Sequence, residues 1–189
     1  ALARAPAAAA LVVAALTADE RKALRLAHSQ LRDAVGEATT KLVVDPAATP
    51  AARPPTARRW PRLEELDVQC PDLAALEALG AATWARLRAL SIGNRIGFVQ
   101  RTLGEPAARA LAAALRRMPA LRELELRDLE LSDASAAELF GAEGAAPGLR
   151  ELTMVNSKIT PATAVSVAAS GWRLEELRLR GIPGLGAAG

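Results

Sequence analysis

The residues that carry most enzyme chemistry are scarce in this chain of 189 residues, which has one histidine, one cysteine and no tyrosine. His28 cannot form a two-histidine metal site or an acid–base pair of histidines. No phosphate-binding loop, G-x-S-x-G or C-x-x-C motif is present, and Asp128, Glu130 and Asp133 lack the spacing of a calcium loop. The sequence therefore predicts a protein that is not an enzyme and that holds neither a cofactor nor a metal ion.

Aromatic residues and dense basic runs are also missing. Aromatic residues make up 3% of the chain and the net charge is only +3, so the stacking platforms and phosphate-neutralising clusters of nucleic-acid-binding proteins are not expected. The apolar stretch 7–16 is about half the ~20 residues that a membrane span needs. We interpret it as a packed N-terminal helix, with the remnant of a signal or transit segment as the alternative. We therefore expect no nucleic-acid partner and no membrane span.

The single cysteine, Cys70, excludes an internal disulfide. This indicates a reducing intracellular compartment, either the cytoplasm or the nucleus, with an organelle as the alternative after N-terminal processing. The first residue is Ala1, which suggests a processed product or a fragment of a longer one.

One phrase recurs along the chain. Its variants are WPRLEELDV (60–68), WARLRALSI (84–92), MPALRELEL (118–126), PGLRELTMV (147–155) and WRLEELRLR (172–180). Aligned, they share the pattern L-x-x-L-x-L, and their first leucines lie 24, 34, 28 and 25 residues apart. Thr39, Leu42 and Val44 mark a degenerate earlier unit. Repetition at this spacing is typical of arrays whose units cannot bury a core alone.

The phrase resembles the leucine-rich-repeat family. That resemblance implies an α/β solenoid, in which each unit gives a strand on a concave face and a helix on a convex face. The family's usual asparagine is replaced, and the residues in its place are Pro71, Arg95, Leu129, Ser157 and Ile182. The ribonuclease-inhibitor-like and F-box-associated branches tolerate this variation and are the closer resemblance.

Helix signals separate the strands. Pro106 near the start and Pro119 beyond the end predict a helix over 105–118. Thr160 precedes Pro161 as an N-cap, and Ser132 can cap a helix that ends before Gly141. A short helical segment is expected over 72–79.

The N-terminal segment 1–44 is expected to be helical. Thr17 and Glu20 form a capping box, and the helix that follows carries Leu24, Leu31 and Val35 on one face. Residues 11–35 resemble the latter part of an F-box, although a leucine replaces the family's tryptophan and the opening Leu-Pro phrase is absent. The resemblance implies docking of this face to a Skp-type adaptor. The alternative is a cap that shields the first repeat.

Five prolines lie within 45–61, so this range is predicted to be a linker, and the repeat array is expected over 62–189, with about five strands and an incomplete last repeat. The range 181–189 contains four glycines and one proline and cannot build a capping repeat. Leu174, Leu177 and Leu179 are then expected at an exposed edge that further repeats or a partner would cover. We expect the isolated chain to self-associate or to need its complex for solubility.

The side chains that flank the middle leucine of each strand should line the concave face. They suggest an acidic strip edged by arginines, in which Arg122 and Arg150 offset the repulsion between Glu123 and Glu151; the alternative is a solvated face of mixed charge. The predicted partner-binding residues are Glu65, Asp67, Arg88, Arg122, Glu123, Glu125, Arg127, Arg150, Glu151, Thr153, Glu176 and Arg178.

These patterns predict a non-catalytic protein-interaction module or scaffold. One alternative is an F-box-type substrate receptor of a cullin ubiquitin ligase. The other is a permanent accessory subunit of a large assembly. The partner itself is not encoded in any motif.

Overall fold

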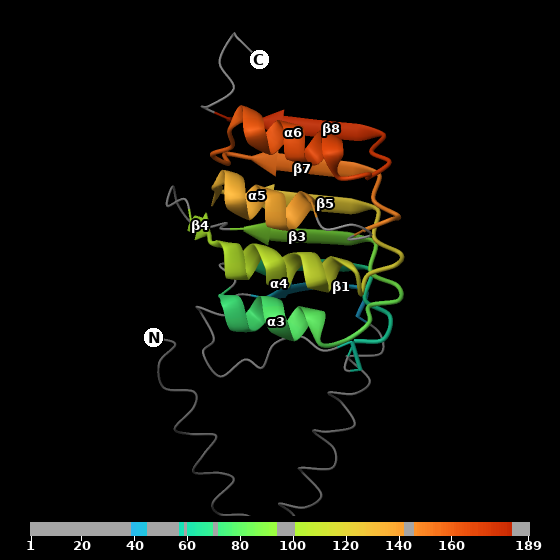
Figure 1. The fold of residues 1–189 in the computed structure, drawn as a ribbon. Coiled ribbons are helices and arrows are strands. Elements are labelled where there is room, and N and C mark those ends of the chain that lie inside the picture. The colour runs from blue at the N-terminus through green and yellow to red at the C-terminus, as the bar shows by residue number, and fades with distance from the viewer. Residues whose placement is uncertain are drawn as a thin grey trace, which may run out of the picture. The chain divides into compact units, whose positions relative to one another are not determined.

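The computed structural model describes residues 39–44, 57–58, 60–69, 72–93, 101–141 and 146–182. Within these ranges the chain has an α/β fold of parallel strands and four helices (Figure 1). The residues expected to dock an adaptor, Leu24, Leu31 and Val35, lie outside the described residues, as do Cys70, His28 and most of the linker expected over 45–61.

The main sheet has six parallel strands in the order β1-β2-β3-β5-β7-β8, which follows their order along the chain. Their bounds are β1 Lys41–Val44, β2 Glu65–Gln69, β3 Ala89–Gly93, β5 Glu123–Arg127, β7 Glu151–Val155 and β8 Glu176–Arg180. Strands are thus present at all five copies of the phrase and at the degenerate earlier unit, whose Leu42 and Val44 lie in β1. Residues 41–44 therefore extend the sheet, although they were expected at the end of the N-terminal segment.

Neighbouring strands of the main sheet pair so that corresponding positions of the recurring phrase lie opposite each other. The middle leucines stand side by side across the sheet, in the series Leu42, Leu66, Leu90, Leu124, Leu152 and Leu177. Because side chains alternate along a strand, every residue on either side of these leucines forms a matching row on the other face. The register therefore gathers the polar positions of all six strands on one surface.

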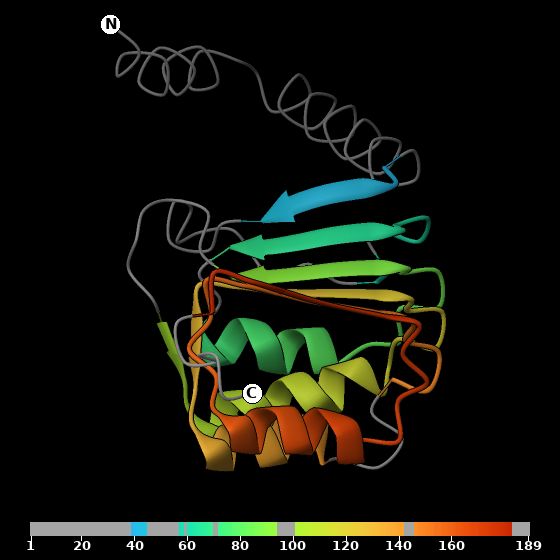
Figure 2. The same cartoon turned by 90° about the horizontal axis from the view of Figure 1, so that it is seen from above.

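The helices are α3 (Leu73–Gly80), α4 (Glu105–Leu115), α5 (Asp133–Phe140) and α6 (Pro161–Ala169). Figure 2 shows them on the same side of the main sheet. Their caps are local in sequence: Asp72 accepts a hydrogen bond from the Ala75 amide, and Ser132 accepts one from the Ser135 amide. Thr160 forms a capping box with Thr163 at the start of α6.

Helix α4 is shorter than the range 105–118 predicted for it. After Leu115 the chain tightens, because the Arg117 amide donates to the Ala114 carbonyl and the Met118 amide donates to the Leu115 carbonyl. Hydrogen bonds between residues three positions apart satisfy carbonyls at the end of a helix and tighten its last turn. The α-helix therefore ends before Met118. Met118 is thereby buried as the first apolar residue of the next phrase.

A second, two-stranded sheet was not predicted. Strand β4 (Arg101–Leu103) pairs in parallel with β6 (Leu129–Leu131), and Lys158 forms a bridge to Glu130 beside them. Leu103, Leu131 and Ile159 of this region are all buried, and each directly precedes an N-cap residue. The small sheet thus sets where α4, α5 and α6 begin.

The core lies between the main sheet and the helices. Leu87, Leu121 and Leu149 of the phrase are fully buried there, and Phe140 of α5 packs edge-on against Trp172, with ring centroids 5.4 Å apart. The buried Trp84 indole donates to the Leu79 carbonyl, so its one polar atom is satisfied. Among the described helices, none has the length and apolar character required to span a membrane.

Candidate protein-binding surface

We term the face of the main sheet opposite the described helices the open face (Figure 2). Because side chains alternate along a strand, it carries those that point away from the core. The pairing register arranges them in three rows. The first row is Lys41, Glu65, Ala89, Glu123, Glu151 and Glu176; the central row is Val43, Asp67, Ser91, Glu125, Thr153 and Arg178; the third row is Gln69, Gly93, Arg127, Val155 and Arg180.

The first row places three carboxylates next to one another on β5, β7 and β8. Glu123 pairs with Glu151, which pairs with Glu176, and neighbouring strands lie ~4.8 Å apart. Arg178 offsets part of the repulsion, because it donates to Glu151 at 3.1 Å and also to Glu176. Glu123 is exposed and forms no ion pair with the described side chains. Its carboxylate is therefore the most available of the three for binding a partner.

An ion pair crosses the central strand of the open face. Arg127 on β5 donates to Asp67 on β2 at 2.8 Å, and so it extends over the whole width of β3. The crossed strand has small residues here: Ser91, which donates to Glu125 at 3.1 Å, and Gly93, which stands opposite Arg127. Only 17% of the Arg127 side chain is exposed, and its Nε is buried with no hydrogen-bond partner among the described residues.

Gly93 is required at its position by close approach of the backbone. A Cβ atom there would lie 2.1 Å from the Arg127 carbonyl oxygen and 2.7 Å from the Arg127 Cβ. Any side chain would therefore force β3 and β5 apart. Gly93 thus lies directly against Arg127, the residue that forms the ion pair with Asp67.

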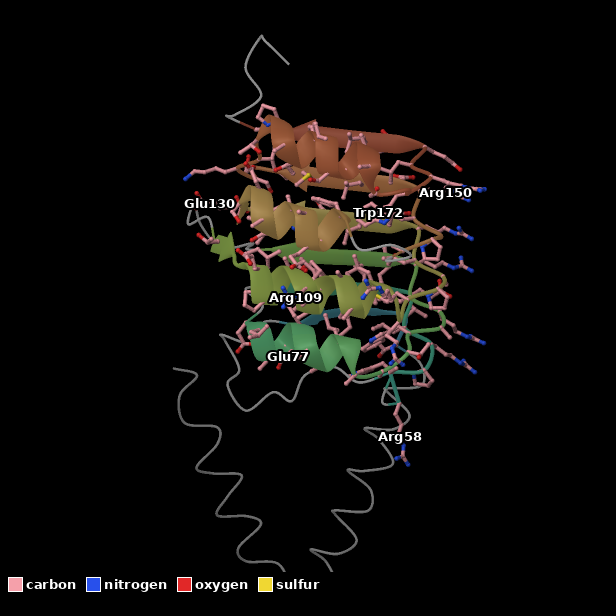
Figure 3. The ribbon with its side chains drawn as sticks, in the orientation of Figure 1. Arg58, Glu77, Arg109, Glu130, Arg150 and Trp172 are labelled. Carbon is pink, nitrogen blue, oxygen red and sulfur yellow. The ribbon has the colours of Figure 1, made fainter. Side chains whose placement is uncertain are left out.

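Arg88, Arg122 and Arg150 lie at the edge of the open face, just before β3, β5 and β7. Arg122 donates to the Gly148 carbonyl at 2.8 Å, and Arg150 donates to the Arg173 carbonyl and pairs with Glu175 at 3.0 Å (Figure 3). These two arginines thus extend to the next unit's loop. Both arginines were expected to offset the repulsion between Glu123 and Glu151. Among the described side chains neither bonds these carboxylates, and Glu151 pairs with Arg178 instead.

The predicted partner-binding residues therefore divide into two groups. Those on the open face are Glu65, Asp67, Glu123, Glu125, Arg127, Glu151, Thr153, Glu176 and Arg178, and those at its edge are Arg88, Arg122 and Arg150. The sequence reasoning placed Ser91 and Gly93 outside the core but did not select them as binding residues. The available signal was that this copy of the phrase has two small residues at positions where three of the four other copies carry larger charged or amide side chains.

A hollow of about 530 Å³ lies elsewhere, against the small sheet. Its polar groups are paired with one another: Thr102 donates to Glu130 at 3.2 Å, Lys158 lies 3.6 Å from Glu130, and Thr160 donates to Asp133 (Figure 3). Within the described ranges no group of three histidine, cysteine, aspartate or glutamate residues could hold a metal ion.

On the helix side, Arg109 of α4 and Glu138 of α5 form a two-bond ion pair, with the shorter bond 2.7 Å (Figure 3). Hydrogen bonding to Arg109 lowers the pKa of Glu138, and the same bond raises the pKa of Arg109. Both groups are solvated, so this pair aligns two neighbouring helices and adds little stability.

No protein-family model matches the chain, and the comparison with curated proteins gives no match. Support for a function therefore comes from the residues and their arrangement.

Proposed function

We propose that the chain is a leucine-rich-repeat array that acts as a non-catalytic protein-interaction module. Three observations support this proposal: the recurring phrase, the strand order that follows the chain, and the placement of the described helices on one side of the main sheet. A doubly wound α/β fold would instead reverse its strand order at a switch point and cover both faces of its sheet. The repeat architecture accounts for all three observations together.

The open face is the proposed binding surface, and the observation that carries this proposal is the carboxylate series Glu123, Glu151 and Glu176. Three carboxylates on neighbouring strands are only partly neutralised by Arg178, which pairs with Glu151 and Glu176, so the surface retains a negative strip with Glu123 at its β5 end. A strip of one sign attracts the opposite charge and fixes the register of a partner. The expected partner is a protein segment that presents basic side chains.

On β2, β3 and β5, the side chains of the proposed binding surface are held in place by hydrogen bonds before a partner binds. The Arg127–Asp67 pair and the Ser91–Glu125 bond hold the side chains of β2, β3 and β5 in one arrangement. Less side-chain freedom is then lost when a partner binds, which favours affinity. The open face thus combines an ordered patch over β2, β3 and β5 with an acidic strip over β5, β7 and β8.

Selection from a displayed peptide library, followed by affinity measurement, tests the proposal. Peptides selected on the full chain should be basic, and their affinity should fall at least roughly tenfold for the double variant Glu123→Arg, Glu151→Arg. The matched control is Glu77→Arg, Glu105→Arg, which makes the same charge change on exposed residues of α3 and α4 and should leave affinity unchanged. Peptides that bind the first variant as well as the wild type, or that lose affinity equally for the control, would contradict the proposal.

A second candidate function is supported by the F-box resemblance of residues 11–35. In that case Leu24, Leu31 and Val35 dock a Skp-type adaptor while the open face holds a substrate. The remaining alternative is an accessory subunit that braces a large assembly. Co-purification with an adaptor and a cullin favours the receptor, whereas a stoichiometric large complex favours the subunit.

A further inference from the structure

The outer edge of β8 differs from every interior strand of the main sheet. Leu177 and Leu179 are 48% and 38% exposed, whereas their counterparts Leu152 and Met154 on β7 are at most 1% exposed. Among the described strands, none pairs with this edge, and β7 pairs with the other side of β8. Two large apolar side chains and a row of backbone groups are thus available there.

The backbone groups at this edge belong to the two leucines. The Glu176 amide donates to the Arg150 carbonyl, and the Arg180 carbonyl accepts from the Asn156 amide, so these residues turn toward β7. Backbone direction alternates along a strand, as side-chain direction does. Leu177 and Leu179 therefore present their amides and carbonyls outward.

We propose that β8 pairs in antiparallel orientation with the β8 of a second copy of this chain, centred on Arg178. In this register each Leu177 faces Leu179 of the other copy as a hydrogen-bonded pair, and the two leucine pairs exchange four backbone hydrogen bonds. Each Glu176 faces Arg180 of the other copy. The main sheet then continues through both copies, and the two open faces join.

The strand's own sequence favours this register. ELRLR carries its one acidic residue at the start and a basic residue at the end, so antiparallel pairing with itself places opposite charges together. The single like-charged contact is Arg178 with Arg178, and each of these side chains is already paired with Glu151 and Glu176 of its own copy. Pairing centred on Leu177 instead would place Leu179 against Glu175, and pairing centred on Leu179 would place Arg178 against Arg180.

The inference does not depend on the binding role of the open face, and sedimentation of the full chain is its first test. The proposal requires a dimer at tens of micromolar. A monomer would overturn it, and would leave the β8 edge to a different partner chain. Higher oligomers would also overturn it, because they indicate head-to-tail stacking of one edge on the other.

Disulfide trapping tests the register. In a Cys70→Ser background, Arg178→Cys should form a cross-linked dimer under mild oxidation, because opposite residues of a non-hydrogen-bonded antiparallel pair have Cβ atoms close enough for a disulfide. The control is Thr153→Cys, in the same row one strand further in, which should stay uncross-linked. Equal cross-linking of both variants, or of neither, contradicts the register.

A charge exchange tests the Glu176–Arg180 contact between copies. Glu176→Arg and Arg180→Glu should each weaken dimerisation roughly tenfold, since each creates two like-charged contacts across the interface. The double variant should restore the wild-type association. The control Arg116→Glu alters an exposed residue at the end of α4 and should have no effect. Additive weakening in the double variant would overturn the pairing.

Discussion

Arg127 and Asp67 are 60 positions apart in the chain, yet the guanidinium of Arg127 donates to the Asp67 carboxylate at 2.8 Å. The pair joins β5 to β2 and skips β3 between them. It can form because the side chains of β3 at this point are small, and because Gly93 stands directly opposite Arg127. This contact therefore links β2 to β5 directly, in addition to the pairing of each with β3.

The first prediction concerns the strength of this pair. Both side chains are largely buried, so breaking the pair by Arg127→Met leaves a poorly solvated carboxylate, and we expect a loss of roughly 1–3 kcal/mol in the free energy of unfolding. Urea unfolding of Arg127→Met, Asp67→Asn and the double variant measures the coupling. Effects that add to within about 0.5 kcal/mol would show that the two side chains do not act together.

The second prediction concerns Gly93. Gly93→Ala should lower the free energy of unfolding by about 1–3 kcal/mol, because the new methyl group would overlap the Arg127 backbone. Gly80→Ala is the matched control: its Cβ would meet only ordinary contacts of 3.5 Å or more, and replacing a helical glycine favours the helix. Equal thermal denaturation of the two variants would contradict the close approach of β3 and β5.

The third prediction concerns the core register. Leu124 is 1% exposed between Leu90 and Leu152, so Leu124→Asp should unfold much of the array by burying a charge. Glu123→Ala, one residue earlier on the open face, should change stability by less than ~1 kcal/mol. Circular dichroism and melting temperature measure both. A Leu124→Asp protein that melts like the wild type would mean that Leu124 faces the solvent and that the assigned faces of β5 are wrong.

The sequence was sufficient for the strands and for the helix caps, because these depend on short-range signals. The five copies of the phrase located five strands, and Thr160 and Ser132 were recognisable as caps from their own neighbourhoods. The small sheet of β4 and β6 was not predicted, since each of its strands is only three residues long and lies outside the recurring phrase. Whether such short strands pair depends on tertiary contacts with neighbouring elements, and not on a local sequence pattern.

The arrangement of charges on the open face could be predicted only by row. The parallel register placed Glu123 beside Glu151 and Glu151 beside Glu176, as the aligned phrase implied. The choice of Arg178 as their counterion, and of the Gly148 carbonyl as the acceptor for Arg122, depends on the reach of long side chains. A flexible arginine has several partners within reach, and the loops of the next unit decide among them.

The last prediction concerns the N-terminal segment, whose docking face was inferred from sequence alone. If Leu24, Leu31 and Val35 bind a Skp-type adaptor, Leu31→Glu should abolish binding of a purified adaptor while the melting temperature of the array stays unchanged, because a charge would then occupy an apolar interface. Lys22→Glu, which the expected helix would place on the side opposite that face, is the control and should bind normally. If the segment is instead a cap for the repeats, the wild type binds no adaptor and Leu31→Glu lowers the melting temperature. An adaptor pull-down combined with a melting curve therefore separates the receptor from the scaffold, because each predicts a loss in the measurement that the other leaves unchanged.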